Sequence, residues 1–469
     1  MFHALIRFSW KVNMTMPTRR IIVLVAAAAL SLFLSKNLFS SPLPDLLDAA
    51  PSRFATSEGV RVHYKSLGDP AAKTAVVFVH GFACDMTSWR AQAPAFDGKA
   101  RMLFVDLPGH GKSDRPAVDY TMERFAAAVE AAMRDAGVER AFLVGHSMGT
   151  PVARQFGRKY PARTLGIVAV DGALRSYFKD PAQVDAFVAR FSGPDYEKTM
   201  SGFFESTFTP ATPDAVKADV RKMAAGFPQP VAASAMKGMF DPAIWKDDAI
   251  KAPLLVLVAK GPMWSADYFA YVKTLNPDAT VVEVAGAGHF LMMEKPAEVN
   301  AALVAFAAKA GAIPVRAARP GRPADVSSPE ALVAAVYDVI SGPAGVKRDW
   351  DRFRSLFADG ARLIPTGIRP AGDFGPSVYD PDGYVRRAEP VFETTGFYEK
   401  GVASRTERFG HVAQVFSTYE ARHDPKDPQP FLRGINSFQL LFDGARWWVV
   451  TIFWEAESET VRIPKEYLP

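Results

Sequence analysis

Six short and almost wholly apolar runs constrain the fold of this chain more than any other feature of its sequence. They are rich in β-branched residues and occupy residues 76–79, 102–105, 142–144, 167–170, 254–258 and 281–284. Continuous hydrophobicity, as opposed to alternation, is typical of parallel strands that are covered on both faces. Helical periodicity at residues 125–133, 152–160 and 299–308 supplies crossovers between them. The sequence therefore predicts an α/β domain with a mostly parallel sheet over residues 53–310.

One connection in this domain is much longer than an ordinary crossover. About seventy residues, with helical periodicity and frequent prolines, separate the run that ends at Val170 from Trp245. Connections of this length usually carry a functional element. We expect residues 172–245 to form a helical lid.

A second domain is predicted after a proline-rich segment. Residues 311–327 contain three prolines among Ala, Arg and Ser and have no apolar period, as is typical of a linker. Helical periods then follow at residues 329–340, 350–357 and 384–392, and strand-like runs at 438–442 and 447–453. The last two runs flank Asp443-Gly444, a strong hairpin signal. This order predicts a separate α+β domain over residues 328–469.

The first 44 residues have a composition of their own. Arg19 and Arg20 precede an apolar run of 14 residues, 21–34. This run is shorter than the roughly 20 residues that a membrane-spanning helix needs. The pattern predicts that residues 1–44 are a signal peptide, or that residues 21–34 attach the chain to the membrane as an anchor. In both cases we expect the protein to be exported and to act in the periplasm or as a secreted protein.

The charge of the remaining chain is balanced. Residues 1–44 hold five of the 55 basic residues and none of the 50 acidic ones, which leaves 50 of each in residues 45–469. The basic pI of about 9.0 is thus due to the N-terminal segment, and the bulk charge does not favour a nucleic-acid partner. The single cysteine, Cys84, excludes an intrachain disulfide.

The motif Gly145-His146-Ser147-Met148-Gly149 follows the third apolar run and opens a helix. In this strand-turn-helix context, a Gly-x-Ser-x-Gly motif presents a nucleophilic serine on a crowded turn, where larger neighbours would clash. His80-Gly81-Phe82 ends the first run. The backbone N–H groups of Phe82 and Met148 are therefore candidates for an oxyanion hole.

His289 lies just beyond the last apolar run, in Gly288-His289-Phe290. With these pieces in order, residues 53–310 resemble the α/β-hydrolase superfamily. The resemblance implies that Ser147 attacks the substrate, that His289 transfers the proton, and that an acid orients the imidazole. No cofactor is implied, and no metal site is expected, because no two histidines have the spacing of metal ligands.

Two aspartates satisfy the expected order of serine, acid and histidine. Asp171 directly follows Val170 at a strand end, a position that some members of the superfamily use. Asp267 follows the next strand, but it falls inside a helix expected to start near Ser265. We favour Asp171, because a strand end fixes its Cα position, and keep Asp267 as the alternative.

The predicted function is that of an exported serine hydrolase that cleaves a carboxylic ester or a related acyl bond. The lid is dense in Phe and Met, which fits a small apolar acyl substrate, and Trp89, His146 and Trp264 are candidate substrate contacts. In the superfamily, a serine at this position excludes the branches that use an aspartate nucleophile, such as epoxide hydrolases. Hydrolysis of C–C bonds and cofactor-free perhydrolysis are the alternatives.

Residues 328–460 resemble the nuclear transport factor 2-like, SnoaL-like group, in which helices precede a curved sheet that forms a cone. The matching pieces are Ala331-Leu332-Val333, Asp349-Trp350 and Trp447-Trp448-Val449-Val450. The resemblance implies a cone whose mouth could be lined by Arg408, His411 or Tyr419, along a strand expected at residues 407–419. A module for homodimerisation is one alternative, and a ligand-binding or scaffold protein with the cone as its functional part is another.

Overall fold

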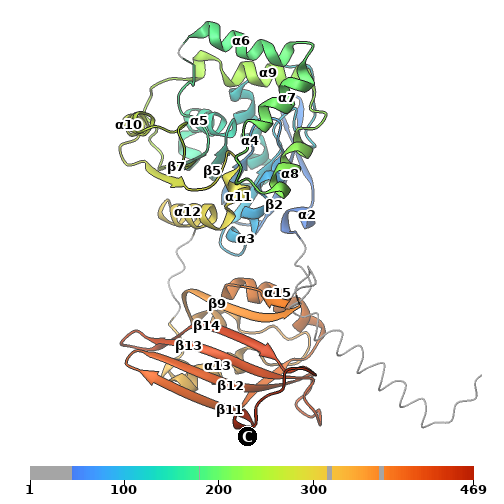
Figure 1. Cartoon of the computed structure of the whole chain (residues 1–469), viewed down its shortest axis with the longest axis vertical. Helices are drawn as coiled ribbons and strands as arrows, with labels where there is room; N and C mark the ends of the chain where they lie inside the picture. Colours follow the sequence, from blue (N-terminus) through green and yellow to red (C-terminus); the bar gives the residue numbers. More distant parts are fainter. Residues whose placement is uncertain (1–44, 179, 314–319, 369–373) are drawn as a thin grey trace, which may run out of the picture. The chain divides into compact units, whose positions relative to one another are not determined.

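The computed structural model describes residues 45–178, 180–313, 320–368 and 374–469, which form two compact units that divide near residue 315 (Figure 1). Each unit has its own sheet and its own hydrophobic core. The predicted signal peptide or anchor at residues 1–44 lies outside the described residues. In the described ranges, no helix is both long and apolar enough to cross a membrane.

The first unit is built on an eight-stranded sheet in the order β1-β2-β4-β3-β5-β6-β7-β8. Its strands are β1 (Arg53–Ser57), β2 (Val60–Leu67), β3 (Thr74–Val79), β4 (Arg101–Val105), β5 (Arg140–His146), β6 (Thr164–Val170), β7 (Leu254–Ala259) and β8 (Thr280–Val284). β2 is antiparallel to β1 and β4, and all other pairs are parallel. The six predicted strands and the mostly parallel sheet are confirmed.

Two strands, β1 and β2, were not predicted, because β1 is a mostly exposed edge strand and buried polar side chains interrupt the apolar pattern of β2. His63 on β2 is buried and its Nδ1 lies 2.7 Å from Asp106 Oδ2. Lys65 is also buried and donates to the carbonyl oxygen of Leu47 at 2.6 Å. Such partners satisfy the hydrogen-bonding groups of buried polar side chains. A strand can therefore be buried even though its sequence is not apolar.

The predicted crossover helices are also present. They are α4 (Met122–Asp135), α5 (Gly149–Lys159) and α12 (Pro296–Lys309), and the shorter helices of this unit are α2 (Leu46–Ala49), α3 (Ala93–Phe96), α10 (Ala266–Leu275) and α11 (Leu291–Glu294). α4 packs beside α5, and α12 packs beside α3. The central strands β3 to β6 are buried almost without interruption, as expected for a sheet covered on both faces.

The long connection between β6 and β7 contains four α-helices in its described part. These are α6 (Pro181–Ser192), α7 (Tyr196–Glu205), α8 (Asp214–Ala224) and α9 (Gln229–Met239). Figure 1 shows α6, α7 and α9 in green, gathered at one end of the unit. We call α6 to α9 the helical insert. Its interior is aromatic: the Phe187 ring lies 5.5 Å from Phe191 and 5.4 Å from Phe240.

The second unit is a six-stranded sheet in the order β10-β9-β14-β13-β12-β11, with three helices. Its strands are β9 (Phe357–Ile368), β10 (Phe374–Pro376), β11 (Tyr398–Phe409), β12 (Val412–Arg422), β13 (Leu432–Phe442) and β14 (Trp447–Ala456). Its helices are α13 (Pro329–Ile340), α14 (Trp350–Ser355) and α15 (Pro381–Thr394), which share a core with the sheet. The predicted hairpin joins β13 to β14, with Phe442 opposite Trp447. The likeness to the SnoaL-like group and the cone shape stay predictions.

One expected helix of the second unit is confirmed with a shorter end, and one expected strand was wrong. The helix expected at residues 350–357 is α14, which ends at Ser355, and Phe357 already begins β9. The single strand expected at residues 407–419 crosses the turn of a hairpin, because β11 ends at Phe409 and β12 begins at Val412. Gly410 between them has a φ of +56°, a conformation that glycine adopts without strain and that lets the chain reverse.

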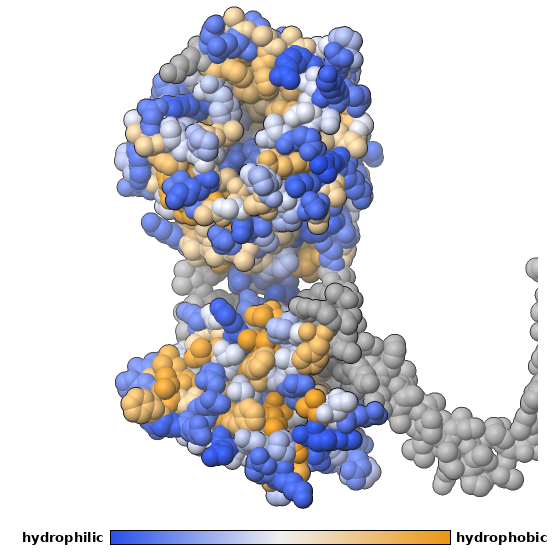
Figure 2. Space-filling view, in the orientation of Figure 1, coloured by the Kyte–Doolittle hydropathy of each residue, from blue (hydrophilic) through white to orange (hydrophobic). Residues whose placement is uncertain are grey.

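The outer face of this sheet is partly apolar. Five large apolar side chains of β11 to β14 are exposed: Phe409, Val412, Leu441, Val450 and Phe453. Figure 2 shows orange, hydrophobic surface among blue surface over this unit. Alternate residues of β12 and β13 point to the opposite face and are buried in the core, as the two-residue period of a strand requires.

Candidate active site

Ser147 lies on the turn between β5 and α5, in a strained backbone conformation. Its φ is +50°, which residues other than glycine rarely adopt. A Cβ at Gly145 would lie 2.2 Å from the carbonyl oxygen of Gly149, and one at Gly149 would lie 2.3 Å from that of Val79. Both neighbours must therefore be glycine for the chain to make this turn. The Ser147 residue is half-buried.

His289 is held by a buried carboxylate at the end of β6. Its Nδ1 lies 2.7 Å from Asp171 Oδ2, and its side chain keeps 20% of its surface exposed. Asp171 is buried, and its Oδ1 accepts hydrogen bonds from the backbone N–H of Ala259 and from the indole of Trp264, each at 2.8 Å. These donors fix the carboxylate, so it orients the imidazole.

Of the two candidate acids, the geometry favours Asp171. Asp267 lies in the first turn of α10, where its Oδ2 pairs with the Arg175 guanidinium at 2.7 Å. Its side chain is 81% exposed, so it faces solvent and not the interior in which Asp171 lies.

The two turns that carry the predicted oxyanion donors meet at Ser147. A Cβ built on Gly81, at the end of β3, would lie 3.1 Å from Ser147 Cβ. Phe82 follows Gly81 directly, and Met148 follows Ser147 as the residue that caps α5. The two backbone N–H groups thus belong to two turns that contact each other at Ser147.

The predicted substrate contacts are buried, which corrects part of the prediction. Trp89 is fully buried against Phe78 and His146, at ring distances of 5.3 and 6.3 Å, and has no surface left for a substrate. Trp264 is also buried and donates its indole N–H to Asp171. Its contact is therefore with the acid that orients His289.

His146 lies behind the site and contacts the chain at His289. It is buried, its Nε2 lies 2.9 Å from the carbonyl oxygen of His289, and the two rings are 4.7 Å apart. Burial and the nearby His289 hold the pKa of His146 well below its usual range. Neutral His146 therefore donates Nε2–H to that carbonyl and supports the backbone of His289.

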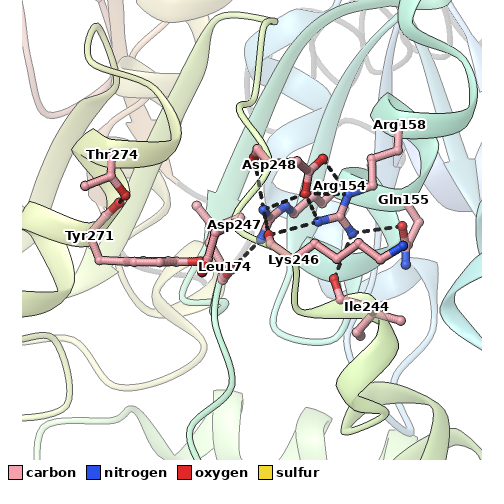
Figure 3. Close-up of polar contacts among 10 residues, drawn as sticks. All are labelled: Arg154, Gln155, Arg158, Leu174, Ile244, Lys246, Asp247, Asp248, Tyr271 and Thr274. Atoms are coloured by element: carbon pink, nitrogen blue, oxygen red, sulfur yellow. Dashed lines mark hydrogen bonds and ion pairs between the residues drawn. The ribbon is translucent and has the colours of Figure 1, made fainter.

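Two arginines on α5 bind both ends of the connection that contains the helical insert (Figure 3). Arg154 is buried and donates to the carbonyl oxygens of Leu174, at 2.5 Å, and of Lys246. Arg158 pairs with Asp248, its Nε 2.9 Å from Oδ2. Because α5 begins at Gly149, just after the turn of Ser147, the connection is fixed to the helix next to that turn.

The helical insert also contacts the loop of His289. The backbone N–H of His289 donates to the carbonyl oxygen of Thr207 at 3.3 Å. Glu294 Oε2 accepts from the backbone N–H of Gly288 at 2.9 Å and from the hydroxyl of Thr212 at 3.0 Å. The insert therefore covers the loop that carries the histidine.

The insert places phenylalanine rings around the turn at Phe82. Four rings lie within 6.5 Å of its ring centroid: Phe191, Phe203, Phe204 and Phe227. Phe203 is half-buried, whereas the other three are buried. The surroundings of the predicted oxyanion hole are therefore apolar.

The residues predicted for the mouth of the second unit are not brought together. Arg408 lies at the hairpin turn, with its guanidinium 4.8 Å from the centre of the Trp447 ring. His411 lies in the same turn, whereas Tyr419 is buried on β12. Tyr419 thus faces the interior of the unit, away from the turn of the other two.

Comparison with known proteins shows which family the first unit resembles. Residues 74–296 match the family described as alpha/beta hydrolase fold. A Cupriavidus necator protein, the dihydrolipoyllysine-residue acetyltransferase component of the acetoin cleaving system, is 28% identical over 259 residues, 54% of this chain and 68% of that protein. Epoxide hydrolase B of Mycobacterium tuberculosis is 34% identical over 122 residues, 25% of this chain and 34% of that protein.

A solved structure agrees with this match. A thermophilic esterase from Thermogutta terrifontis superimposes with a TM-score of 0.51 at 25% identity, covering 56% of this chain and 99% of that one. The chain therefore contains an alpha/beta hydrolase fold domain. The esterase and the epoxide hydrolase among these relatives support a hydrolase.

Sequence reasoning missed the supporting residues of the site. Nothing in the sequence marks Trp264 as the donor to Asp171, because their contact joins segments 93 positions apart. Arg154 offered a signal: it stands among the buried residues of the amphipathic α5, where an arginine needs several acceptors.

Proposed function

We propose that the protein is a serine hydrolase that cleaves a carboxylic ester or a related acyl bond. The single observation that carries this proposal is the contact of His289 Nδ1 with Asp171 Oδ2, at 2.7 Å. Ser147 lies on its strained turn directly after His146, whose ring is 4.7 Å from that of His289. A serine, a histidine and a buried carboxylate in this order form the arrangement that activates a hydroxyl for acyl transfer.

The mechanism follows from the roles of these groups. Ser147 Oγ attacks the acyl carbon while His289 Nε2 accepts its proton, and the resulting imidazolium is stabilised by Asp171. The backbone N–H groups of Phe82 and Met148 bind the oxyanion. His289 then protonates the leaving alcohol, which departs and leaves an acyl-enzyme. Water then attacks this ester while His289 accepts its proton, and His289 returns the proton to Ser147 Oγ as the acid is released.

The nucleophile itself argues for an acyl substrate over an epoxide. Attack of a serine hydroxyl on an epoxide carbon would form an ether, which water at the active site does not cleave. Attack on an acyl carbon forms an ester, which the same groups hydrolyse. We therefore do not carry the activity of the epoxide hydrolase relatives over to this chain.

The substrate we propose is a small apolar acyl compound. The phenylalanines of the helical insert surround Phe82, and no charged residue takes part in that ring cluster. Hydrolysis of a C–C bond next to a carbonyl is the second candidate, because the same oxyanion donors and histidine serve it. The helical insert acts as a lid in this proposal, and residues 1–44 direct export or anchor the chain.

A fluorophosphonate probe tests the proposal, because it reacts with activated serines. We expect wild type to be labelled, to hydrolyse short-chain aryl esters, and to lose both properties in Ser147→Ala. An unlabelled wild type that turns over no ester in an acyl-chain series would overturn it. Activity on diketones with little activity on esters would move the assignment to the C–C bond hydrolases.

A further inference from the structure

The second unit contains a cavity of about 830 Å³ between α13 and the strands β11 and β12. Tyr337, Glu399 and Ser417 line it, and Tyr337 and Glu399 also border a smaller, deeper cavity of about 50 Å³. Tyr384, Tyr419 and Asn436 line that deeper cavity together with apolar side chains. Polar groups thus gather where the large cavity meets the core.

The strand register explains why polar groups face this cavity. Glu399 on β11 is paired with Ala421 on β12, and Ser417 is paired with Asn436 on β13. Residues directly opposite in antiparallel strands lie on one face of a sheet. Ala421, Ser417 and Asn436 are all buried, so this face is the inner one, and it carries Glu399 as well.

A chain of hydrogen bonds connects these groups. The Asn436 amide donates to Glu399 Oε1 at 3.1 Å and to the Tyr337 hydroxyl at 3.2 Å. Tyr337 in turn donates to Ser417 Oγ at 2.8 Å. In the described part of the chain, no lysine, arginine or histidine forms an ion pair with the Glu399 carboxyl. An inward carboxyl without a cation is expensive for stability and so points to a function.

We propose that this cavity is a second binding site, which takes a small neutral molecule with an apolar body and a carbonyl oxygen. Glu399 donates a hydrogen bond to that oxygen, and Asn436 and Tyr337 hold the carboxyl in place. Apolar walls formed by Val333, Val415 and Phe438 contact the body of the ligand.

The charge state of Glu399 agrees with this role. Burial among apolar and aromatic groups raises the pKa of Glu399 from 4.5 to about 8, although the amide of Asn436 acts in the opposite direction. Near pH 7 the carboxyl therefore keeps its proton, and a neutral acid can donate to a ligand oxygen. Burial also raises the pKa values of Tyr337, Tyr384 and Tyr419, so these phenols stay uncharged up to high pH.

Charged groups occur in the outer part of the cavity. They are Glu330 and Asp338 on α13, Lys400 on β11 and Arg422 on β12. Arg422 pairs with Glu420 at 2.9 Å, and Asp338 pairs with Arg352 at 2.5 Å. A charged end of a ligand would meet both signs here, so the outer part gives no preference for an anion or a cation.

The fluorescent aromatic ketone prodan tests this site in the full-length protein, because its emission moves to shorter wavelength when the dye leaves water for a mostly apolar cavity. We expect saturable binding at pH 7, measured as a blue shift relative to prodan in water, that weakens at least fivefold between pH 7 and pH 9 as Glu399 loses its proton. Glu399→Gln keeps a neutral N–H donor, so it should bind at pH 7 within threefold of wild type and show no such weakening.

Two variants control the location of the ligand. Ser404→Trp, opposite Ser417 on the wall of the cavity, should weaken binding at least tenfold by filling the space. Glu407→Gln makes the same change as Glu399→Gln on an exposed part of β11 and should behave as wild type. Absence of saturable binding, or the same pH dependence in Glu399→Gln as in wild type, would overturn the proposal. If Ser404→Trp does not fold, the pair of glutamine variants decides.

Discussion

The two units each hold an inward-facing carboxyl group, buried at Asp171 and half-buried at Glu399, and they surround it with different partners. Asp171 in the first unit accepts hydrogen bonds from a backbone N–H and an indole and also contacts His289. Among the described residues, the Glu399 carboxyl in the second unit accepts one side-chain hydrogen bond, from the amide of Asn436, and its pKa is raised to about 8. The same functional group thus serves as an acceptor in one place and as a donor in the other.

This difference shows that partners, and not burial alone, decide what a buried carboxyl can do. A carboxylate with several donors and a histidine next to it can stabilise a positive imidazolium during a reaction. A carboxyl with few donors is neutral near pH 7 and can itself donate to a ligand. The two sites should therefore respond differently when the carboxyl is replaced by its amide and when the pH is changed.

The largest expected effect is that of Ser147→Ala on hydrolysis. Removing the nucleophile should lower kcat for an aryl ester by about 10⁴- to 10⁶-fold, because the other residues of the arrangement cannot act without it. Prodan binding at the second site should stay within twofold of wild type. Equal hydrolysis by wild type and variant would show that the first unit does not use this serine.

The replacement of each of these two carboxyls by its amide compares the two sites directly. Asp171→Asn should lower kcat by about 10³- to 10⁴-fold, because the amide no longer stabilises the imidazolium of His289. Glu399→Gln should leave ester hydrolysis within twofold of wild type. Asp267→Asn is the matched control in the first unit and should also stay within twofold. A larger loss for Asp267→Asn than for Asp171→Asn would transfer the role of the acid to Asp267.

The sequence revealed these two sites to very different degrees. Ser147, His289 and Asp171 each follow an apolar strand, and a strand end fixes a position in a parallel sheet, so their proximity was predictable. Glu399 lies in a strand whose sequence alternates weakly, and its partners come from β13 and α13. One sequence feature pointed to the second site: Asn436 is a polar residue on the inward face of β13, which it shares with Phe438 and Leu440.

The stability of the second unit should depend on pH through Glu399. Its folded-state pKa of about 8 exceeds its ordinary value of 4.5, so the folded state keeps a proton that the unfolded state has lost. Stability is therefore full below about pH 4.5, falls as pH rises from 4.5 to 8, and is level above that. The loss is on the order of 1.4 kcal/mol for each tenfold difference in proton affinity.

Calorimetry of the full chain at several pH values measures this loss. The transition of the second unit should move to lower temperature between pH 5 and pH 8 in wild type and in Glu407→Gln, but much less in Glu399→Gln. The transition of the first unit serves as an internal reference. An identical pH response in Glu399→Gln and wild type would contradict the raised pKa of this group.

Removal of the contacts between α5 and the connection that contains the helical insert should have a smaller effect, on the stability of the first unit. Arg154→Ala leaves the carbonyl oxygens of Leu174 and Lys246 without this donor and should destabilise the first unit by roughly 2–4 kcal/mol. Denaturant unfolding measures the change, and Arg190→Ala, on the exposed face of α6, is the control. The second unit should unfold as in wild type, since its core contains neither residue.

The smallest expected effect concerns His146, which supports the chain at His289. His146→Phe keeps an aromatic ring between Trp89 and Phe290 but removes the donor to the carbonyl oxygen of His289. The loss of one such hydrogen bond is worth about 1 kcal/mol, so kcat should fall roughly fivefold with little change in KM. His146→Gln, which retains an N–H donor, should recover part of kcat. A rise in KM with unchanged kcat would instead assign His146 to substrate binding, as the sequence suggested.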